Sequence, residues 1–194
     1  MKMAKKLLAV VLTGVMAVSM LTGCATLNTR NIASDLEGLL KTANDKATVS
    51  ATSDAKKLAE QAAKAVQDKN TIWVAPTSEV SMEDAVKAKL DTDHITDKYV
   101  WYTCYKNEGV KNVAQAQEIY NLLVKEKLVY AADALNYDKI AKIAVGDKKY
   151  MPQPGNKFEL GLKTFEKKEG DKKVEYTVVI VTCKAAATNV PATD

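Results

Sequence analysis

The sequence predicts an α+β fold, in which Ala/Lys-rich N-terminal helices precede a small domain with a mainly antiparallel sheet ending in a C-terminal hairpin. From Ile32 to Lys69 the chain has no aromatic residue, and its apolar residues recur at helical spacing. Near the C-terminus, apolar and polar residues alternate on both sides of Gly170-Asp171. Helices grouped ahead of a terminal hairpin are typical of α+β proteins rather than of alternating α/β folds.

Two helices are predicted in the N-terminal region, residues 32–70. Leu36, Leu39 and Leu40 follow Ile32 on one helical face. The polar stretch Thr48–Ser53 then interrupts the pattern, and Ser53 is a suitable N-cap for a second helix. Both apolar stripes are narrow, and isolated helices of this length are marginal in water. The region is therefore expected either to pack on the rest of the chain or to form a helical stalk.

Three elements are predicted in the middle of the chain. Thr71–Val74 is a short β-prone run that Pro76 stops. Ser81–Asp84 has the pattern of a capping box, which opens a helix through Leu90. Tyr99–Tyr105 is dense in aromatic and β-branched residues, which favours a strand.

Two further helices and a loop are expected before the hairpin. Asn112–Leu128 has an amphipathic pattern. Asn136 is a suitable N-cap for a helix through Ala144, with Gly146 as the residue that stops it. The prolines and glycine of residues 152–155 indicate a loop.

The hairpin closes the predicted α+β domain, residues 71–184. Phe158, Leu160 and Leu162 alternate with polar residues before the turn. Residues 178–181 are apolar at every position, so this strand is expected to lie centrally in the sheet. The small and polar residues 185–194 are expected to form a frayed tail.

The N-terminus carries a targeting pattern. Lys2, Lys5 and Lys6 precede an apolar run, Leu7–Met20, which is followed by Leu21-Thr22-Gly23-Cys24. This order resembles the signal peptide and lipobox of bacterial lipoproteins. The 14-residue run would span roughly 21 Å as a helix, short of a bilayer core of about 30 Å.

The resemblance implies removal of residues 1–23 by cleavage between Gly23 and Cys24, and acylation of Cys24. It also implies a chain anchored by lipid on the extracytoplasmic face of a cell membrane, the outer membrane being an option if the cell has one. Residues 24–31 are then expected to be a short tether. Two acyl chains meet the requirement for stable anchoring.

Removal of the signal changes the charge balance. Three of the 28 basic residues leave with it, so 25 basic face 24 acidic residues. A nearly neutral chain gives nucleic acid no electrostatic footprint, and nucleic acid is excluded as an expected partner. The expected partners are the bilayer, through acylated Cys24, and a glycan, a peptide or an envelope protein.

Cys104 and Cys183 remain as an even pair once Cys24 is acylated. An extracytoplasmic location permits a disulfide between them. Two separate buried thiols are the alternative, because sequence does not fix the distance between the residues.

An aromatic cluster is the one candidate binding face. Tyr99, Trp101 and Tyr105 share one side of the predicted strand, since side chains alternate along it, and Tyr102 points the other way. Tyr and Trp offer flat apolar faces with polar tips, which suit a sugar ring or a peptide. The alternative is that the same residues are core beneath helices.

Catalytic and metal-binding patterns are missing from the sequence, and no catalytic residue, metal site or cofactor is expected. His94 is the only histidine. Its neighbours Asp91, Asp93 and Asp97 lack the Gly and Glu of a calcium loop, so a solvated turn is expected.

The sequence thus favours a non-catalytic binding or envelope-interaction module. A structural or assembly lipoprotein without a ligand pocket is one alternative. A hydrolase using carboxylates such as Glu83, Asp84 or Asp93 is another.

Overall fold

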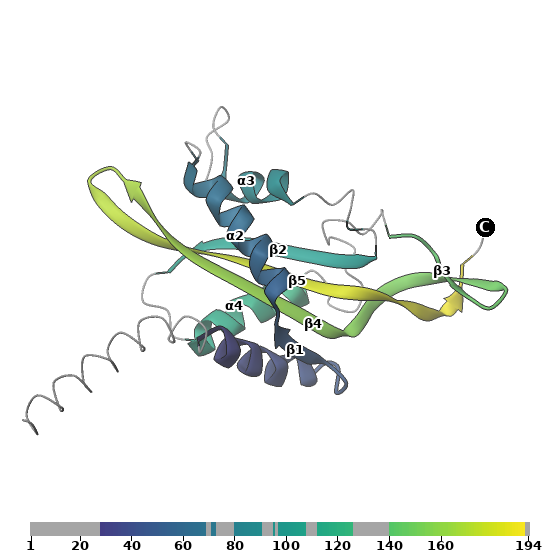
Figure 1. The fold of residues 1–194 in the computed structure, drawn as a ribbon. Coiled ribbons are helices and arrows are strands. Elements are labelled where there is room, and N and C mark those ends of the chain that lie inside the picture. Colours follow the sequence, from purple (N-terminus) through teal and green to yellow (C-terminus); the bar gives the residue numbers. More distant parts are fainter. Residues whose placement is uncertain are drawn as a thin grey trace, which may run out of the picture.

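The computed structural model of the protein describes residues 28–68, 71–72, 80–90, 95, 97–107, 112–125 and 140–192. A sheet runs through the middle of this part of the chain, and helices cover both of its faces (Figure 1). The predicted signal peptide, Cys24 and His94 lie outside the described residues.

In the part of the chain that the structure describes, the sheet has five strands: β1 (Thr48–Ala51), β2 (Lys98–Lys106), β3 (Ile143–Val145), β4 (Lys148–Glu169) and β5 (Lys172–Pro191). Their order is β1-β4-β5-β2, and β3 pairs with β4. β1 runs parallel to β4, whereas the other described pairs are antiparallel. The predicted α+β class is therefore confirmed, and the sheet is mixed rather than purely antiparallel.

Among the described residues, two helices lie on each face of the sheet. Residues 28–41 form one helix, which shares a face with α4 (Asn112–Lys125). On the other face lie α2 (Ser53–Asp68) and α3 (Met82–Lys89). Figure 1 shows α2 and α3 above the strands and α4 below them.

Alternation along the strands builds a separate core on each face. Val179 and Val181 of β5 pack under helix 28–41 and α4, together with Leu36 and Ile119. The intervening residues of β5, such as Ile180, pack under α2 and α3. A strand that is apolar on both faces must be covered on both, so the predicted central position of this strand is confirmed.

The β4–β5 hairpin turns where the sequence predicts. Gly170 has a φ of 61°, a conformation that glycine adopts without steric cost. The strands are longer than expected, because residues 185–187 pair with residues 152–154. The expected frayed tail is therefore wrong up to Pro191, and the expected loop at residues 152–155 is part of β4. Register shifts on either side of Pro152 and Pro154 accommodate the two missing N–H groups.

Two short strands lie where the sequence predicts a polar interruption and a helix. The polar stretch at Thr48–Ala51 is β1, in which only Val49 is buried. Ala144 lies in β3 instead of a helix, and Gly146, at a φ of 61°, belongs to the turn that joins β3 to β4. In both cases pairing with β4 decides the conformation, and local propensity does not.

The N-terminal helices pack on the sheet and do not form a stalk. Ile32, Leu36 and Leu40 are buried in the core. The helix is already present at residue 28, so the expected tether 24–31 is wrong for its last four residues. The second helix begins as predicted, but Thr52 is the capping side chain, since its Oγ1 accepts a hydrogen bond from the N–H of Ala55 at 3.3 Å.

The remaining predicted elements are largely confirmed. Ser81 caps α3 by accepting a hydrogen bond from the N–H of Asp84. β2 covers the predicted aromatic strand, and α4 covers the predicted helix up to Lys125. Of the predicted strand 71–74, Ile72 forms an isolated bridge with Ser81, and the last two residues lie outside the described part.

Candidate functional site

The predicted aromatic binding face is core. Tyr99 and Trp101 are 0% and 2% exposed, and helix 28–41 and α4 cover them. Trp101 lies between Tyr99 and Phe158, with ring centroids 6.0 Å from each. Tyr105 is half-buried, and its hydroxyl donates a hydrogen bond to Gln115 Oε1 at 3.0 Å. The three rings share a face as expected, but they present no exposed platform to a ligand.

Cys104 and Cys183 are buried as separate thiols. They lie on opposite faces of the sheet. Tyr99 is the residue opposite Cys183, and Cys104 lies five positions farther along β2, about 16 Å away. The disulfide is therefore not formed. Burial raises the pKa of each thiol to about 12, so neither is an activated nucleophile.

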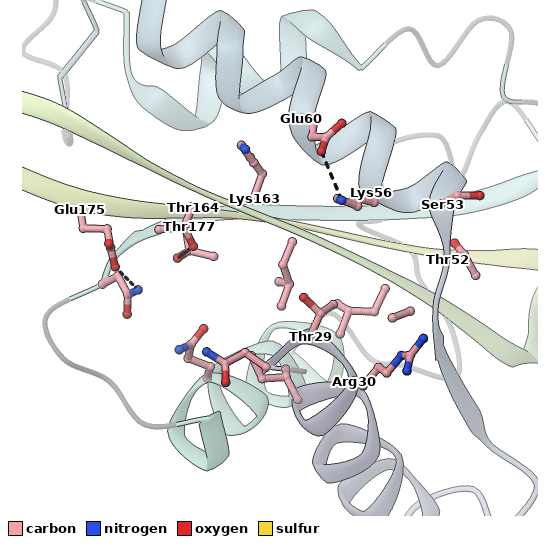
Figure 2. Close-up of a pocket in the computed structure, with 17 residues that line it drawn as sticks. Thr29, Arg30, Thr52, Ser53, Lys56, Glu60, Lys163, Thr164, Glu175 and Thr177 are labelled. Atoms are coloured by element: carbon pink, nitrogen blue, oxygen red, sulfur yellow. Dashed lines mark hydrogen bonds and ion pairs between the residues drawn. The ribbon is translucent and has the colours of Figure 1, made fainter. Parts of the chain in front are cut away.

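A pocket of about 580 Å³ opens at the edge of β4. Most of the side chains that line it are polar, and Figure 2 shows that they come from α2 on one side and from helix 28–41 and α4 on the other. Its principal lining residues are Asn28, Thr29, Arg30, Thr52, Ser53, Lys56, Glu60, Asn107, Gln115, Leu160, Leu162, Lys163, Thr164, Glu175 and Thr177.

The pocket occupies the place that a longer β1 would fill. β1 pairs with β4 only as far as Ala51, which lies opposite Leu160. At Thr52 the chain leaves the sheet and enters α2. β4 continues beyond this point, and Leu162 and Thr164 form part of the pocket wall there. The pocket is thus a slot between two helical layers, with a sheet edge along one side.

The edge of β4 at this slot has unpaired main-chain groups. The N–H of Thr52 donates to the carbonyl of Leu160 at 3.3 Å, so the main-chain groups of Leu160 point away from β5. Because direction alternates along a strand, those of Leu162, Thr164 and Glu166 point outward as well. No described residue hydrogen-bonds to these outward groups.

Side chains in the slot divide into paired and unpaired groups. Lys56 and Glu60 form an ion pair at 3.6 Å, and Asn107 donates a hydrogen bond to Glu175. The hydroxyls of Thr164 and Thr177 form a hydrogen bond at 3.1 Å. Arg30 and Lys163 make no ion pair with any described residue. The slot therefore offers two cations, several hydroxyls and an unfilled sheet edge.

The other candidate residues lie elsewhere. Glu83 and Asp84 are exposed in the first turn of α3, on the sheet face opposite helix 28–41 and outside the pocket. Gly23, Cys24, Asp93 and His94 lie outside the described residues. Within the described ranges, no group of three His, Cys, Asp or Glu side chains could hold a metal ion. None of the described helices is long and apolar enough to span a bilayer.

Sequence reasoning missed the pocket, although one signal points to it. Along one face of β4 the residues change from Phe158, Leu160 and Leu162 to Thr164. Thr177, opposite Thr164 in β5, is polar on the same face. A change from apolar to polar on one face of a covered strand marks the end of the core. The helix and strand ends that complete the pocket are far apart in the sequence and carry no common motif.

No protein-family model, curated protein or solved structure matches this chain.

Proposed function

We propose that this chain is a membrane-anchored extracytoplasmic bacterial lipoprotein whose folded domain is a non-catalytic binding module, with the slot at the β4 edge as its binding site. The observation that carries the proposal is the convergence of polar side chains from separate segments on one pocket. Its volume of about 580 Å³ falls in the range typical of ligand sites.

Anchoring would hold this pocket close to the bilayer. Asn28 lines the pocket and is the fourth residue after Cys24. Four residues span at most about 14 Å when fully extended. A lipid on Cys24 would therefore keep the slot near the membrane surface, where a ligand on or beside the envelope is accessible.

The pocket favours binding over the two alternatives. A structural lipoprotein without a ligand pocket does not account for a polar slot of this size. For hydrolysis, two carboxylates should face each other across a cleft. The two in this slot are engaged separately, Glu60 by Lys56 and Glu175 by Asn107, and Figure 2 draws them in different parts of the pocket.

Anchoring is tested by metabolic labelling with an alkyne fatty acid. We expect the full chain to incorporate the label and the Cys24→Ala variant to lose it and accumulate as the uncleaved precursor. Cys104→Ala is the matched control, because its thiol is buried in the domain, and it should be labelled normally. A Cys24→Ala variant that is still cleaved and labelled would show that the chain is not a lipoprotein of this kind.

Binding is tested by placing a photoreactive residue in living cells at Ser53, an exposed pocket residue, or at Lys87, exposed on α3 away from the slot. We expect a discrete adduct from position 53 only. Identical products from both positions, or none from position 53, would count against the binding module.

A further inference from the structure

We propose that the slot binds an extended peptide segment carrying an acidic side chain, which pairs with the outer edge of β4 and continues the line of β1. The inference rests on the proposed function, because it takes the slot to be the binding site. It goes further by naming the chemical class of the ligand and the main-chain groups that recognise it.

The unpaired main-chain groups define the kind of ligand. Leu162, Thr164 and Glu166 each direct one N–H and one C=O away from β5, and no described residue pairs with them. Backbone donors and acceptors at a regular spacing are complementary to another extended backbone. From Leu162 to Glu166 the edge is about 13 Å long, which matches a segment of about five residues.

The walls of the slot fit a strand better than a compact molecule. β1 already occupies the same edge as far as Ala51, with Val49 packed under helix 28–41 and Ser50 exposed on the other face of the strand. Beyond Ala51 the two helical layers still line the pocket, through Thr29 on one side and Lys56 on the other (Figure 2). A peptide entering here would occupy the position of a sheet strand with a helix on each side.

Charged side chains on many edge strands hinder the pairing of another strand. Two charged residues at this edge of β4, Glu166 and Lys167, are instead held by partners within the domain. Lys167 is turned toward α2, where its Nζ donates to the carbonyl of Val66 at 3.0 Å. Glu166 is paired with Lys173 across the hairpin at 3.0 Å. Both side chains thus have partners within the domain.

Two cations give the slot a charge preference. Arg30 and Lys163 line it and form no ion pair with a described residue. Of the two carboxylates in the slot, Glu60 is paired with Lys56, and Glu175 accepts a hydrogen bond from the neutral Asn107, so the cations of the slot outnumber its carboxylates by one. Asp or Glu on the peptide would complement these cations, which is the reason for assigning it an acidic side chain.

The test uses the purified chain without its signal peptide and a random library of acetyl- and amide-capped hexapeptides. We expect saturable binding of a subset enriched in Asp or Glu. The best binder is then N-methylated at alternate positions. One set of methyl groups should abolish binding and the other should leave it unchanged, because an added strand uses the donors of only one of its edges.

Paired substitutions on β4 test the same contact from the protein side. Thr164→Pro removes an outward N–H without removing a bond to β5, and should weaken binding at least about tenfold. Thr164→Val loses the same hydroxyl but keeps the N–H, and should bind within about threefold of the parent. Lys168→Pro also removes an outward N–H, outside the pocket, and should leave affinity unchanged. Glu166→Pro replaces Thr164→Pro if circular dichroism shows that the latter is unfolded.

The preference for an acidic side chain is tested with a separate variant. Arg30→Gln should weaken the acidic peptides about fivefold and leave their Asn- or Gln-substituted versions unaffected.

Failure of this inference is distinguishable from failure of the proposed function. Absence of any binding peptide, equal binding by the Thr164→Pro and Thr164→Val variants, or tolerance of both methylation sets would overturn the peptide assignment. A discrete adduct from position 53 in cells would, in the same case, leave the binding module standing with a ligand of another class.

Discussion

At the scale of single residues, the packing of a helix against the sheet depends on the residues at their closest contact. Gly161 of β4 is buried where the first turn of α2 crosses the sheet. A Cβ placed there would lie 2.1 Å from the main-chain carbonyl atoms of Ala55 and 2.6 Å from the N of Lys56. Those contacts are with backbone, which cannot rotate away, so the absence of a side chain at Gly161 sets how closely α2 approaches β4.

Gly161→Ala should therefore destabilise the protein by about 3 kcal/mol or more, because α2 must shift as a unit. Gly38→Ala is the matched control. Gly38 is exposed in helix 28–41, and apart from the neighbouring backbone of its own helix no atom lies within 4 Å of the place that a methyl group would take, so alanine there should stabilise by about 0.5–1 kcal/mol. Urea denaturation of the two variants measures the difference, and equal stabilities would contradict the tight crossing.

The two buried thiols predict a stability loss at high pH. Burial raises the pKa of Cys104 and Cys183 from 9.0 to about 12. Between these values the unfolded chain loses the thiol protons and the folded chain keeps them, so alkaline pH favours unfolding. Stability should be unaffected below pH 8 and fall by about 1.4 kcal/mol per pH unit for each thiol above pH 9.

Denaturation between pH 8 and pH 10 measures this slope. The Cys104→Ala/Cys183→Ala double variant should have a much flatter profile over the same range. A parent profile as flat as that of the double variant would mean that the thiols are not buried.

At the scale of elements, the sequence predicts the parts whose pattern is local. β2 is dense in aromatic and β-branched residues, the hairpin has clear alternation, and α3 carries its own capping box. β1 was not predictable in this way. It is a four-residue polar strand, and its partner β4 lies 109 positions later, from Thr48 to Lys157. The pocket was not predictable for the same reason, because it lies where β1 ends and β4 continues.

The boundary between β1 and α2 gives a prediction for this scale. Thr52 both donates its N–H to Leu160 and caps α2 with its hydroxyl. Thr52→Ala should cost about 1 kcal/mol through loss of the cap, whereas Ser53→Ala, at the position that the sequence favours as the cap, should change stability by less than about 0.3 kcal/mol. Thermal unfolding of both variants decides between the two capping residues, and a larger cost at Ser53 would contradict the structure.

At the scale of the whole molecule, the hairpin is the element on which both helical layers depend. β5 contributes to the cores on both faces, and β4 pairs with β1, β3 and β5. Helix 28–41 and α2 have narrow apolar surfaces that pack in cores built with these two strands, whereas α3 packs on α2 and β2. Local patterns predicted the helices, but the decision between a stalk and packed helices depended on contacts that span most of the chain.

A chain that ends at Asp147, and so lacks β4 and β5, should consequently be largely unfolded. Its circular dichroism should show a small fraction of the helix content of the full domain, because isolated helices of this length are marginal. Removal of residues 193–194 alone, which keeps the hydrogen bond from the N–H of Ala192 to the carbonyl of Lys149, should leave stability unchanged. A cooperative thermal transition in the chain ending at Asp147 would show that the helices fold independently.

The separation between β1 and β4 also determines when the protein can fold during its synthesis. β1 cannot join the sheet until residues near Lys157 have emerged from the ribosome. The N-terminal elements therefore cannot pack in their final positions before most of the chain has been synthesised. In the proposed export route, Cys24 would reach the acylating enzyme while everything behind it is still unstructured. The lipid would then be in place first, and the domain would assemble last, with its N-terminus already held at the membrane.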